Sequence, residues 1–246
     1  QDLEKWTSCS EIRHVLETKD HVTICVESKE RTWEFMIYPV VGGFRMVAGK
    51  KGFFDGKPEA FSMEESEHAY IIRSKEHEMI LQKETLEISI DRKAITNLKN
   101  ISFIFEKESV SASRIQFSIH ENSAIYGFGE RFDSVNQYGK TVALWQRDAC
   151  EGCLASIGNQ AYKNIPLVHT SDGFSFFANT SYRMRMDVGD AVQDYLSVEA
   201  LGDVFDFYIW SGTPREAMTA YGTLTGLPIF PPEWVFEPWA GGGGGR

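Results

Sequence analysis

The sequence predicts a mainly β fold, an antiparallel β-sandwich that fills residues 1–211. Apolar and polar side chains alternate with a period of two in many short segments, as they do in a strand with one buried face. Gly, Lys and Asp separate many of these segments, and helical periodicity is almost absent before residue 212. These observations favour a sandwich over an alternating α/β domain.

The alternation is clearest in the segment Tyr182–Val188, where the apolar side chains fall on one face and Arg183, Arg185 and Asp187 fall on the other. One face is therefore expected to be buried and the other to be wet. The same reasoning predicts strands at His21–Glu27, Thr32–Pro39, Phe44–Ala48, Ala69–Arg73, Glu78–Gln82, Leu86–Asp91, Ile101–Glu106, Arg114–Ile119, Thr141–Gln146, Gly173–Asn179, Tyr182–Val188, Val192–Glu199 and Asp203–Trp210.

A helix is expected after the sandwich, within a linker of residues 212–232. Residues 213–216 read Thr-Pro-Arg-Glu, which combines a capping box with proline at the first helical position. Ala217, Tyr221 and Leu224 recur at helical spacing until Gly226. This spacing predicts a helix of about 12 residues.

Residues 233–246 are expected to begin a second unit. Prolines at 228, 231 and 232 stiffen the approach to it, and Trp234–Phe236 is predicted to be its first strand. The glycines at 241–245 are not followed by Lys, Ser or Thr, so a phosphate-binding loop is not expected. An active-site loop is preferred for them, and a flexible end is the alternative.

Composition limits the classes of function. The chain has 246 residues, 42% of them hydrophobic, and 25 basic against 35 acidic side chains give a net charge of −10. That charge opposes binding to nucleic acid and suits a neutral or cationic ligand. No stretch reaches the roughly 18 apolar residues of a membrane helix, and the first residues lack the parts of a signal peptide. The protein is expected to be cytoplasmic, or secreted or periplasmic with a leader already removed.

Neither a metal site nor a cofactor is expected. Cys150 and Cys153 have metal-ligand or redox spacing, but no second pair completes a zinc site and no βαβ pattern surrounds them. They are interpreted as loop cysteines. The six histidines are scattered without ligand spacing, and none is assigned to catalysis. Asn100 and Asn179 head glycan-acceptor triplets, a pattern that often arises by chance.

Several short motifs follow one another between about residues 124 and 239. They are Tyr-Gly-Phe-Gly-Glu-Arg-Phe at 126–132, Trp-Gln-Arg-Asp at 145–148, Gln-Ala-Tyr-Lys-Asn-Ile-Pro at 160–166, Ser-Gly-Thr-Pro at 211–214 and Pro-Pro-Glu-Trp-Val-Phe at 231–236. In their order and spacing these motifs resemble glycoside hydrolase family 31. The resemblance implies an N-terminal sandwich that leads into the first strand of a (β/α)8 barrel at 233–246. Members of the family are retaining α-glycosidases, some transglycosidases and a few lyases.

The resemblance also implies that the reactive groups lie outside this chain. Such glycosidases need two carboxyl groups about 5 Å apart, and in the family both lie on barrel strands far downstream. A barrel takes roughly 250 residues, whereas only residues 233–246 follow the double proline. No catalytic residue is expected here, and the chain alone is expected to be inactive. Glu130 is interpreted as structural, with its charge paired to Arg131, and neither Asp133 nor Asp148 belongs to a recognisable carboxylate pair.

Substrate contacts are implied for residues 145–148. Asp148 matches an aspartate that, in relatives resembling α-xylosidases, reaches from a sandwich loop to a sugar hydroxyl. A charged acceptor makes strong hydrogen bonds, and a turn-capping role is the alternative. Arg147 either pairs with the neighbours of Asp148 or contacts the sugar, and Trp145 is either a packing residue or a sugar platform.

Phe236 and Glu237 are the other candidate substrate-binding residues. Phe236 matches an aromatic residue that lines the pocket at the end of the first barrel strand, and a place in the barrel core is the alternative. Glu237 stands where the family commonly has a small residue. Its carboxylate would face the site and could accept a hydrogen bond from an extra hydroxyl or meet a cationic substituent.

The expected function is that of the N-terminal part of a retaining α-glycosidase that hydrolyses terminal α-linked xylose, glucose or galactose. The sandwich would support the barrel and lend a loop to the substrate site, with carbohydrate as the partner and homo-oligomerisation left open. A free-standing, non-catalytic carbohydrate-binding β-sandwich is one alternative. A family 31 transglycosidase or α-glucan lyase is another.

Overall fold

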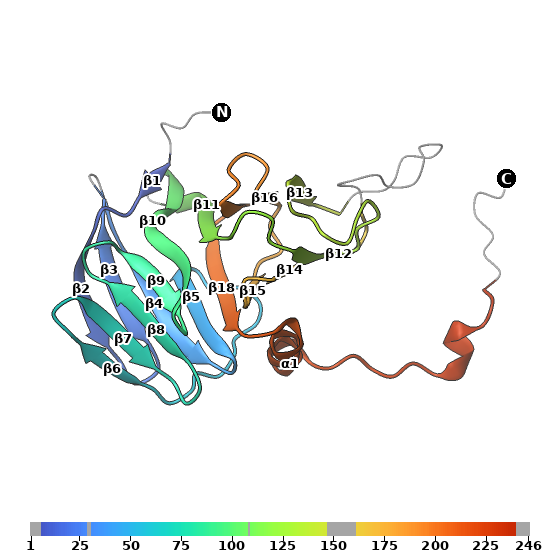
Figure 1. Ribbon diagram of the computed structural model, residues 1–246, viewed down its shortest axis with the longest axis horizontal. Helices are drawn as coiled ribbons and strands as arrows, with labels where there is room; N and C mark the ends of the chain where they lie inside the picture. Colours follow the sequence, from blue (N-terminus) through green and yellow to red (C-terminus); the bar gives the residue numbers. More distant parts are fainter. Residues whose placement is uncertain (1–5, 29–30, 108, 147–160, 240–246) are drawn as a thin grey trace.

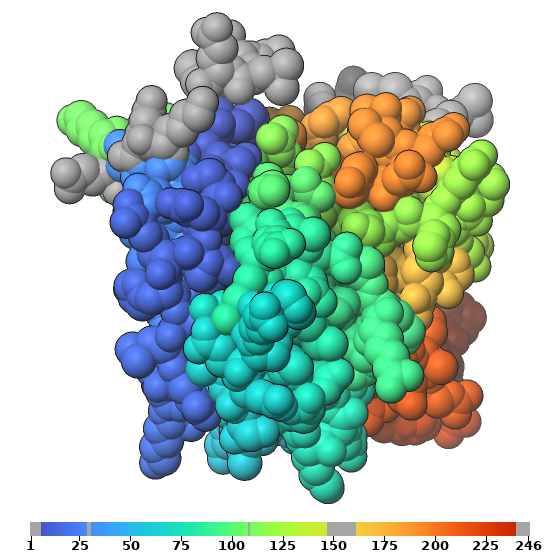
Figure 2. Space-filling model, turned by 60° about the vertical axis from the view of Figure 1, so that its left-hand side comes forward, coloured from blue at the N-terminus to red at the C-terminus, as the bar shows by residue number. Residues whose placement is uncertain are grey.

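Two antiparallel sheets pack face to face in the computed structural model, which describes residues 6–28, 31–107, 109–146 and 161–239. The α-helix α1 lies against one sheet, and the chain then runs away from the sandwich (Figure 1). In Figure 2 the cyan and green segments of one sheet lie beside the blue N-terminal strands of the other. The predicted β-sandwich is thus confirmed.

Within the described residues, ten strands form sheet A and eight form sheet B, and neighbouring strands within each sheet pair antiparallel. Sheet A has the order β13 (Lys140–Leu144), β16 (Met184–Val188), β17 (Tyr195–Leu201), β11 (Ser109–Ser118), β10 (Lys93–Glu106), β9 (Glu87–Ile90), β8 (Glu78–Gln82), β7 (Ala69–Arg73) and β6 (Ser62–Glu65), with β1 (Thr7–Ser8) paired to β10. Sheet B has the order β12 (Ile125–Gly129), β14 (Asn164–Thr170), β15 (Phe174–Ala178), β18 (Val204–Ser211), β5 (Gly43–Gly49), β4 (Thr32–Val40), β3 (Val22–Glu27) and β2 (Glu11–Glu17).

The core lies between the two sheets and is rich in phenylalanine. Phe117 of β11 stacks on Phe176 of β15 with ring centroids 4.3 Å apart, and Phe103 of β10 meets Phe205 of β18 edge to face at 5.4 Å. Such aromatic pairs add about 1 kcal/mol each beyond the area they bury. They connect sheet A to sheet B because each pair takes one ring from each sheet.

The face of Tyr182–Val188 that was expected to be exposed to solvent is only partly exposed. Asp187 is 7% exposed, because its carboxylate accepts hydrogen bonds from the backbone N–H groups of Asp190 and Ala191, at 3.1 Å each, in the turn that follows β16. A buried carboxylate is tolerated where backbone donors satisfy it. The strand itself begins later than expected, at Met184, and leaves Tyr182 in the preceding turn, 40% exposed.

The outer face of sheet B is also covered, which explains why every residue of β18 is buried. Part of the cover is helix α1 (Pro214–Thr225), which places Ala217 and Ala220 against the sheet and brings Tyr221 to 5.2 Å from the ring of Phe177. The predicted capping box is present: the amide of Glu216 donates to Oγ1 of Thr213, and its carboxylate accepts from the Thr213 amide at 2.7 Å. The helix prediction is therefore confirmed.

A buried ion pair fixes the loop that follows β5. Arg45 and Asp206 are 1% exposed each, and the guanidinium donates from Nε at 2.9 Å and from Nη2 at 2.7 Å. Burial opposes the charge of Arg45, but the hydrogen bonds to Asp206 outweigh it and raise the pKa of the guanidinium. Asp206 also accepts from the Gly52 amide, at 2.7 Å, and from the side chain of Asn179, at 2.9 Å. Asn179 is fully buried, so this asparagine of the glycan-acceptor triplet has a structural role.

The strand predicted at Trp234–Phe236 is wrong. Glu233–Phe236 form a short 3-10 helix, η2, in which the Val235 amide donates to the Pro232 carbonyl at 3.0 Å. No described strand lies beside this segment, so its backbone groups pair locally within a turn rather than with a neighbouring chain. The side chains from Leu227 to Trp239 are largely exposed, and Phe236 is 75% exposed.

Candidate functional site

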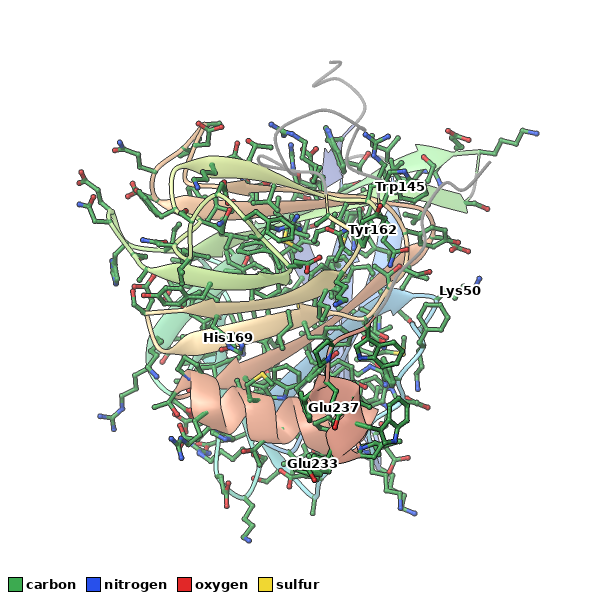
Figure 3. All side chains as sticks on the ribbon, turned by 90° about the vertical axis from the view of Figure 1, so that its right-hand side faces the viewer. Lys50, Trp145, Tyr162, His169, Glu233 and Glu237 are labelled. Atoms are coloured by element: carbon green, nitrogen blue, oxygen red, sulfur yellow. The ribbon has the colours of Figure 1, made fainter. Side chains whose placement is uncertain are left out.

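A pocket of about 240 Å³ lies between β13, at the edge of sheet A, and β14 of sheet B, and Trp145 is the one described residue expected to contact substrate that lines it. Trp145 follows directly after β13, and Asn164 opens β14. The described residues that line the pocket are Leu144, Trp145, Gln146, Asn164, Pro166, Thr180, Ser181, Tyr182 and Met184. Figure 3 shows Trp145 and Tyr162 at this side of the sandwich.

Strand pairing brings these distant residues together. Leu144 at the end of β13 pairs with Met184 at the start of β16, and Asn164 at the start of β14 pairs with Gly129 at the end of β12. Each pairing places a strand end at the same side of the sandwich. Trp145 is 53% exposed there, so its indole forms a wall of the pocket and is not part of the core.

The glycines of the 126–132 motif are required by the backbone. Gly127, Phe128 and Gly129 all have positive φ, at 112°, 66° and 82°, in a bulge of the β12–β14 ladder. A Cβ at Gly129 would collide with the carbonyl oxygen of Lys163. Only glycine allows this close approach.

Arg131 of the same motif points to the pocket wall. Its Nη2 donates to the Phe128 carbonyl at 3.0 Å and to Oδ1 of Asn164 at 2.8 Å, so the predicted pairing with Glu130 gives way to a longer-range contact. Its buried Nε and Nη1 atoms have no hydrogen-bond partner among the described residues. Burial lowers the pKa of Arg131. Sequence reasoning named Arg131 only as the partner of Glu130 and missed its contact with Asn164, because the two residues are 33 positions apart.

The lining of this pocket is chemically simple. Its described residues offer two aromatic rings, amides and hydroxyls, and none of them carries a carboxylate, ammonium, guanidinium or imidazole group. Aromatic rings pack against C–H groups, and amides and hydroxyls both donate and accept hydrogen bonds. A neutral ligand with many hydroxyls and one apolar face suits such a lining.

The other expected substrate-binding residues are not part of this pocket. Phe236 belongs to η2 and Glu237 follows it, and neither lines the pocket at Trp145. Figure 3 shows Glu237 well below Trp145, on the segment that leaves the sandwich. Arg147 and Asp148 lie outside the described residues, as do Cys150 and Cys153. Of the five expected residues Trp145 lines a pocket, and substrate contact stays a prediction for all five.

Three acidic side chains elsewhere, those of Asp133, Asp91 and Glu216, have structural partners. Burial alone would raise the pKa of Asp133, but hydrogen bonds from Lys140, at 2.8 Å, and from Gln137, at 3.1 Å, lower it to about 2. A separate cavity of about 440 Å³ beneath α1 contains Asp91 and Glu216. Asp91 is bonded to the ring of His77 and to a backbone amide, and Glu216 caps the helix. Neither carboxylate is placed as a nucleophile facing an acid.

The described residues form neither a metal-binding cluster nor a membrane-spanning helix. The described His, Cys, Asp and Glu side chains include no group of three that could hold a metal ion. No described helix has both the length and the apolar character needed to cross a bilayer.

Comparison with known proteins points to one family. The model of the glycosyl hydrolase 31 N-terminal galactose mutarotase-like domain matches residues 19–187. Alpha-xylosidase XylQ of Lactiplantibacillus pentosus is 34% identical over 131 residues, which cover 53% of this chain and 16% of the xylosidase.

Solved structures share the fold. The cycloalternan-forming enzyme of Listeria monocytogenes, in complex with a pentasaccharide substrate, matches 94% of this chain with a TM-score of 0.82 and 18% identity. A family 31 dextranase variant of Flavobacterium johnsoniae, complexed with isomaltotriose, matches 93% with a TM-score of 0.74 and 19% identity. The chain spans 23% and 29% of these two proteins. The chain belongs to glycoside hydrolase family 31, in which it corresponds to the N-terminal galactose mutarotase-like domain.

Proposed function

We propose that this chain is the N-terminal part of a retaining α-glycosidase, that its sandwich supports a catalytic barrel, and that the edge at Trp145 contacts the substrate. The observation that carries the proposal is the position of the pocket. Its lining includes Trp145, which lies two positions before Arg147 and three before Asp148 in the motif, and that lining suits a sugar.

The chemistry of the reaction assigns different roles to the barrel and to the sandwich. Retaining hydrolysis needs two carboxyl groups about 5 Å apart, one as nucleophile and one as acid. Asp133, Asp91 and Glu216 are held by structural partners, so none of them is suited to either role. The barrel supplies the acids in this proposal, and the sandwich supplies binding and orientation.

Four further residues belong to the proposed substrate site. Asp148 accepts hydrogen bonds from a sugar hydroxyl, and Arg147 lies beside it as a second contact. Phe236 covers the apolar face of a sugar, and Glu237 accepts from an additional hydroxyl. For the last two, support comes from their exposure: Phe236 is 75% exposed, and Glu237 is exposed on the same segment, so both side chains are available to a neighbouring unit.

The test compares this chain with the complete protein to which it is proposed to belong. Both are assayed with nitrophenyl α-xyloside, α-glucoside and α-galactoside, and the anomeric configuration of the first product is followed by NMR. We expect the complete protein to release one of these sugars with retained configuration and the 246-residue chain to show no turnover. Turnover by the chain alone, or an inverted product, would contradict the proposal.

The products also separate the alternatives within the family. A transglycosidase yields longer oligosaccharides, and a lyase yields an elimination product in place of the free sugar.

A second function is favoured by one observation, the uncharged aromatic lining of the pocket. The sandwich would then be a carbohydrate-binding module without chemistry. Sugar binding by the chain, together with a complete protein that transforms none of the three glycosides, would select this function.

A further inference from the structure

Tyr182 separates two pockets on the same side of the sandwich. On one side of it lies the pocket with Trp145, of about 240 Å³. On the other side lies a second pocket of about 270 Å³, lined by Lys50, Lys51, Gly52, Phe53, Thr180, Ser181, Tyr182 and Val204. Figure 3 shows Trp145, Tyr162 and Lys50 along this side of the molecule. The turn at 180–182 is thus shared by both pockets.

The ring of Tyr182 is held in place by its neighbours. It packs so closely on Gly202 that a Cβ there would come within 2.5 Å of the ring, and Gly202 has a φ of +91°. The phenol hydroxyl donates to Oδ1 of Asp203 at 3.1 Å, and Asp203 also meets the ammonium of Lys50 at 3.6 Å. The hydrogen bond from Tyr182 is the main cause that lowers the pKa of Asp203. A ring fixed in this way loses little entropy when a ligand packs on it.

Both lysines of the second pocket are already engaged. Lys50 pairs with Asp203, and Lys51 pairs with Asp55 at 3.5 Å and lies over the ring of Tyr38 at 4.8 Å. What remains for a ligand is the exposed ring of Phe53, 74% exposed, and the hydroxyls of the shared turn. This set again suits a neutral ligand with an apolar face and several hydroxyls.

We propose that the two pockets hold successive units of an α-linked oligosaccharide, with Tyr182 as the platform between them, Trp145 at one end and Phe53 at the other. This inference rests on the proposed function and extends it from a single sugar contact to a groove for several sugar units. The apolar face of a sugar ring packs on the tyrosine, and its hydroxyls exchange hydrogen bonds with Thr180 and Ser181.

The groove explains an arrangement that a single site would not need. The three exposed rings, of Trp145, Tyr182 and Phe53, are 53%, 40% and 74% exposed, and all three line one of the two adjoining pockets. Aromatic rings exposed to this degree usually have a partner when they gather on one surface.

The test measures sugar binding by the 246-residue chain itself. Calorimetric or NMR titrations use isomaltotriose and two further α-1,6-linked sugars, isoprimeverose and melibiose, with free glucose as the single-unit comparison. We expect the best of the three to bind about tenfold more tightly than glucose. Tyr182→Ala should raise its Kd about tenfold, because the platform is lost.

Two controls make the result specific. Tyr182→Phe keeps the ring on Gly202 and should bind within about twofold of the wild type. Tyr126→Ala removes a ring of the same kind and similar exposure, 37%, that lines neither pocket, and it should have no effect. The folding of each variant is checked by its thermal unfolding.

Three results would overturn the groove: no saturable binding of any of the three sugars up to about 20 mM, an unchanged Kd in Tyr182→Ala, or an equal loss in Tyr182→Phe. Failure of the groove is distinct from failure of the glycosidase proposal. A complete protein that hydrolyses α-glycosides while the chain binds no sugar refutes the groove alone. Tyr182-dependent binding with an inert complete protein refutes the glycosidase proposal alone.

Discussion

Replacement of Asp206 by asparagine tests how strongly the buried ion pair with Arg45 stabilises the sandwich. The carboxylate accepts four hydrogen bonds, two from Arg45 and one each from Gly52 and Asn179, and both charged side chains are 1% exposed. Asp206→Asn keeps the size of the side chain and removes the charge, so a buried guanidinium is left without its main counter-charge. Breaking a buried pair in this way costs about 3–5 kcal/mol. Because Asp55 still contacts Arg45, we expect the lower end, about 3 kcal/mol.

The assay is urea or thermal unfolding of the chain, and the control is a surface pair with the same separation. Arg73 and Glu64 also meet at 2.7 Å, but their side chains are 43% and 60% exposed. Glu64→Gln should cost less than about 1 kcal/mol, whereas Asp206→Asn should lower the Tm by roughly 6–12 °C. Equal losses in the two variants would refute the role given to burial. The double change Arg45→Met with Asp206→Leu should recover part of the loss, since no charge then stays buried.

The other predictions concern two glycines, the loss of folding stability at low pH and the substrate site. Gly129→Ala should lower the free energy of unfolding by about 3 kcal/mol, because φ is positive and the new Cβ collides with the backbone. Gly139→Ala should lower it by only about 1 kcal/mol, because Gly139 has a φ of +76° but open space around it. Similar melting temperatures of the two variants would contradict this. The low pKa of Asp133, about 2, means that its stabilisation is complete above about pH 4 and is lost as the pH falls towards 2. Wild type should therefore lose about 1 kcal/mol more than Asp133→Asn over that range in acid titrations followed by circular dichroism, after allowance for solvent screening. In the complete enzyme, Asp148→Ala should lower kcat/KM ten- to a hundredfold, about 1.4–2.7 kcal/mol; unchanged kinetics would remove it from the site.

The central strands were predictable because burial on one or both faces leaves a strong pattern in the sequence. β4, β5, β7 and β8 lie within a residue or two of their expected bounds. β14 was also missed, and three of the other missed strands carry weaker patterns. β2 is an edge strand with mostly exposed charged residues, β6 is four residues long, and β12 is rich in glycine. The segment at η2 was mistaken for a strand because its apolar residues fit either structure, and pairing partners decide between them.

The candidate site was predictable only where the contributing residues are close in sequence. Trp145 could be chosen from its motif, and the structure places it on the wall of a pocket. Tyr182 was assigned to the buried face of a strand, although the strand starts two residues later and its ring meets Gly202 and Asp203 instead. The link from Arg131 to Asn164 depends on the pairing of β12 with β14, which no local pattern specifies.

The contact between helix α1 and sheet B has a mechanical consequence. Small side chains lie where the helix comes closest to the sheet, and a Cβ at Gly42 would already lie 3.1 Å from that of Ala220. A helix of 12 residues is about 18 Å long, so a tilt of about 10° at its base moves its far end by about 3 Å. The chain leaves the sandwich from that far end. A single methyl group added at Gly42 or Ala220 would therefore tilt the helix and displace the residues that follow Gly226. That displacement exceeds the roughly half ångström that a reacting pair of groups tolerates.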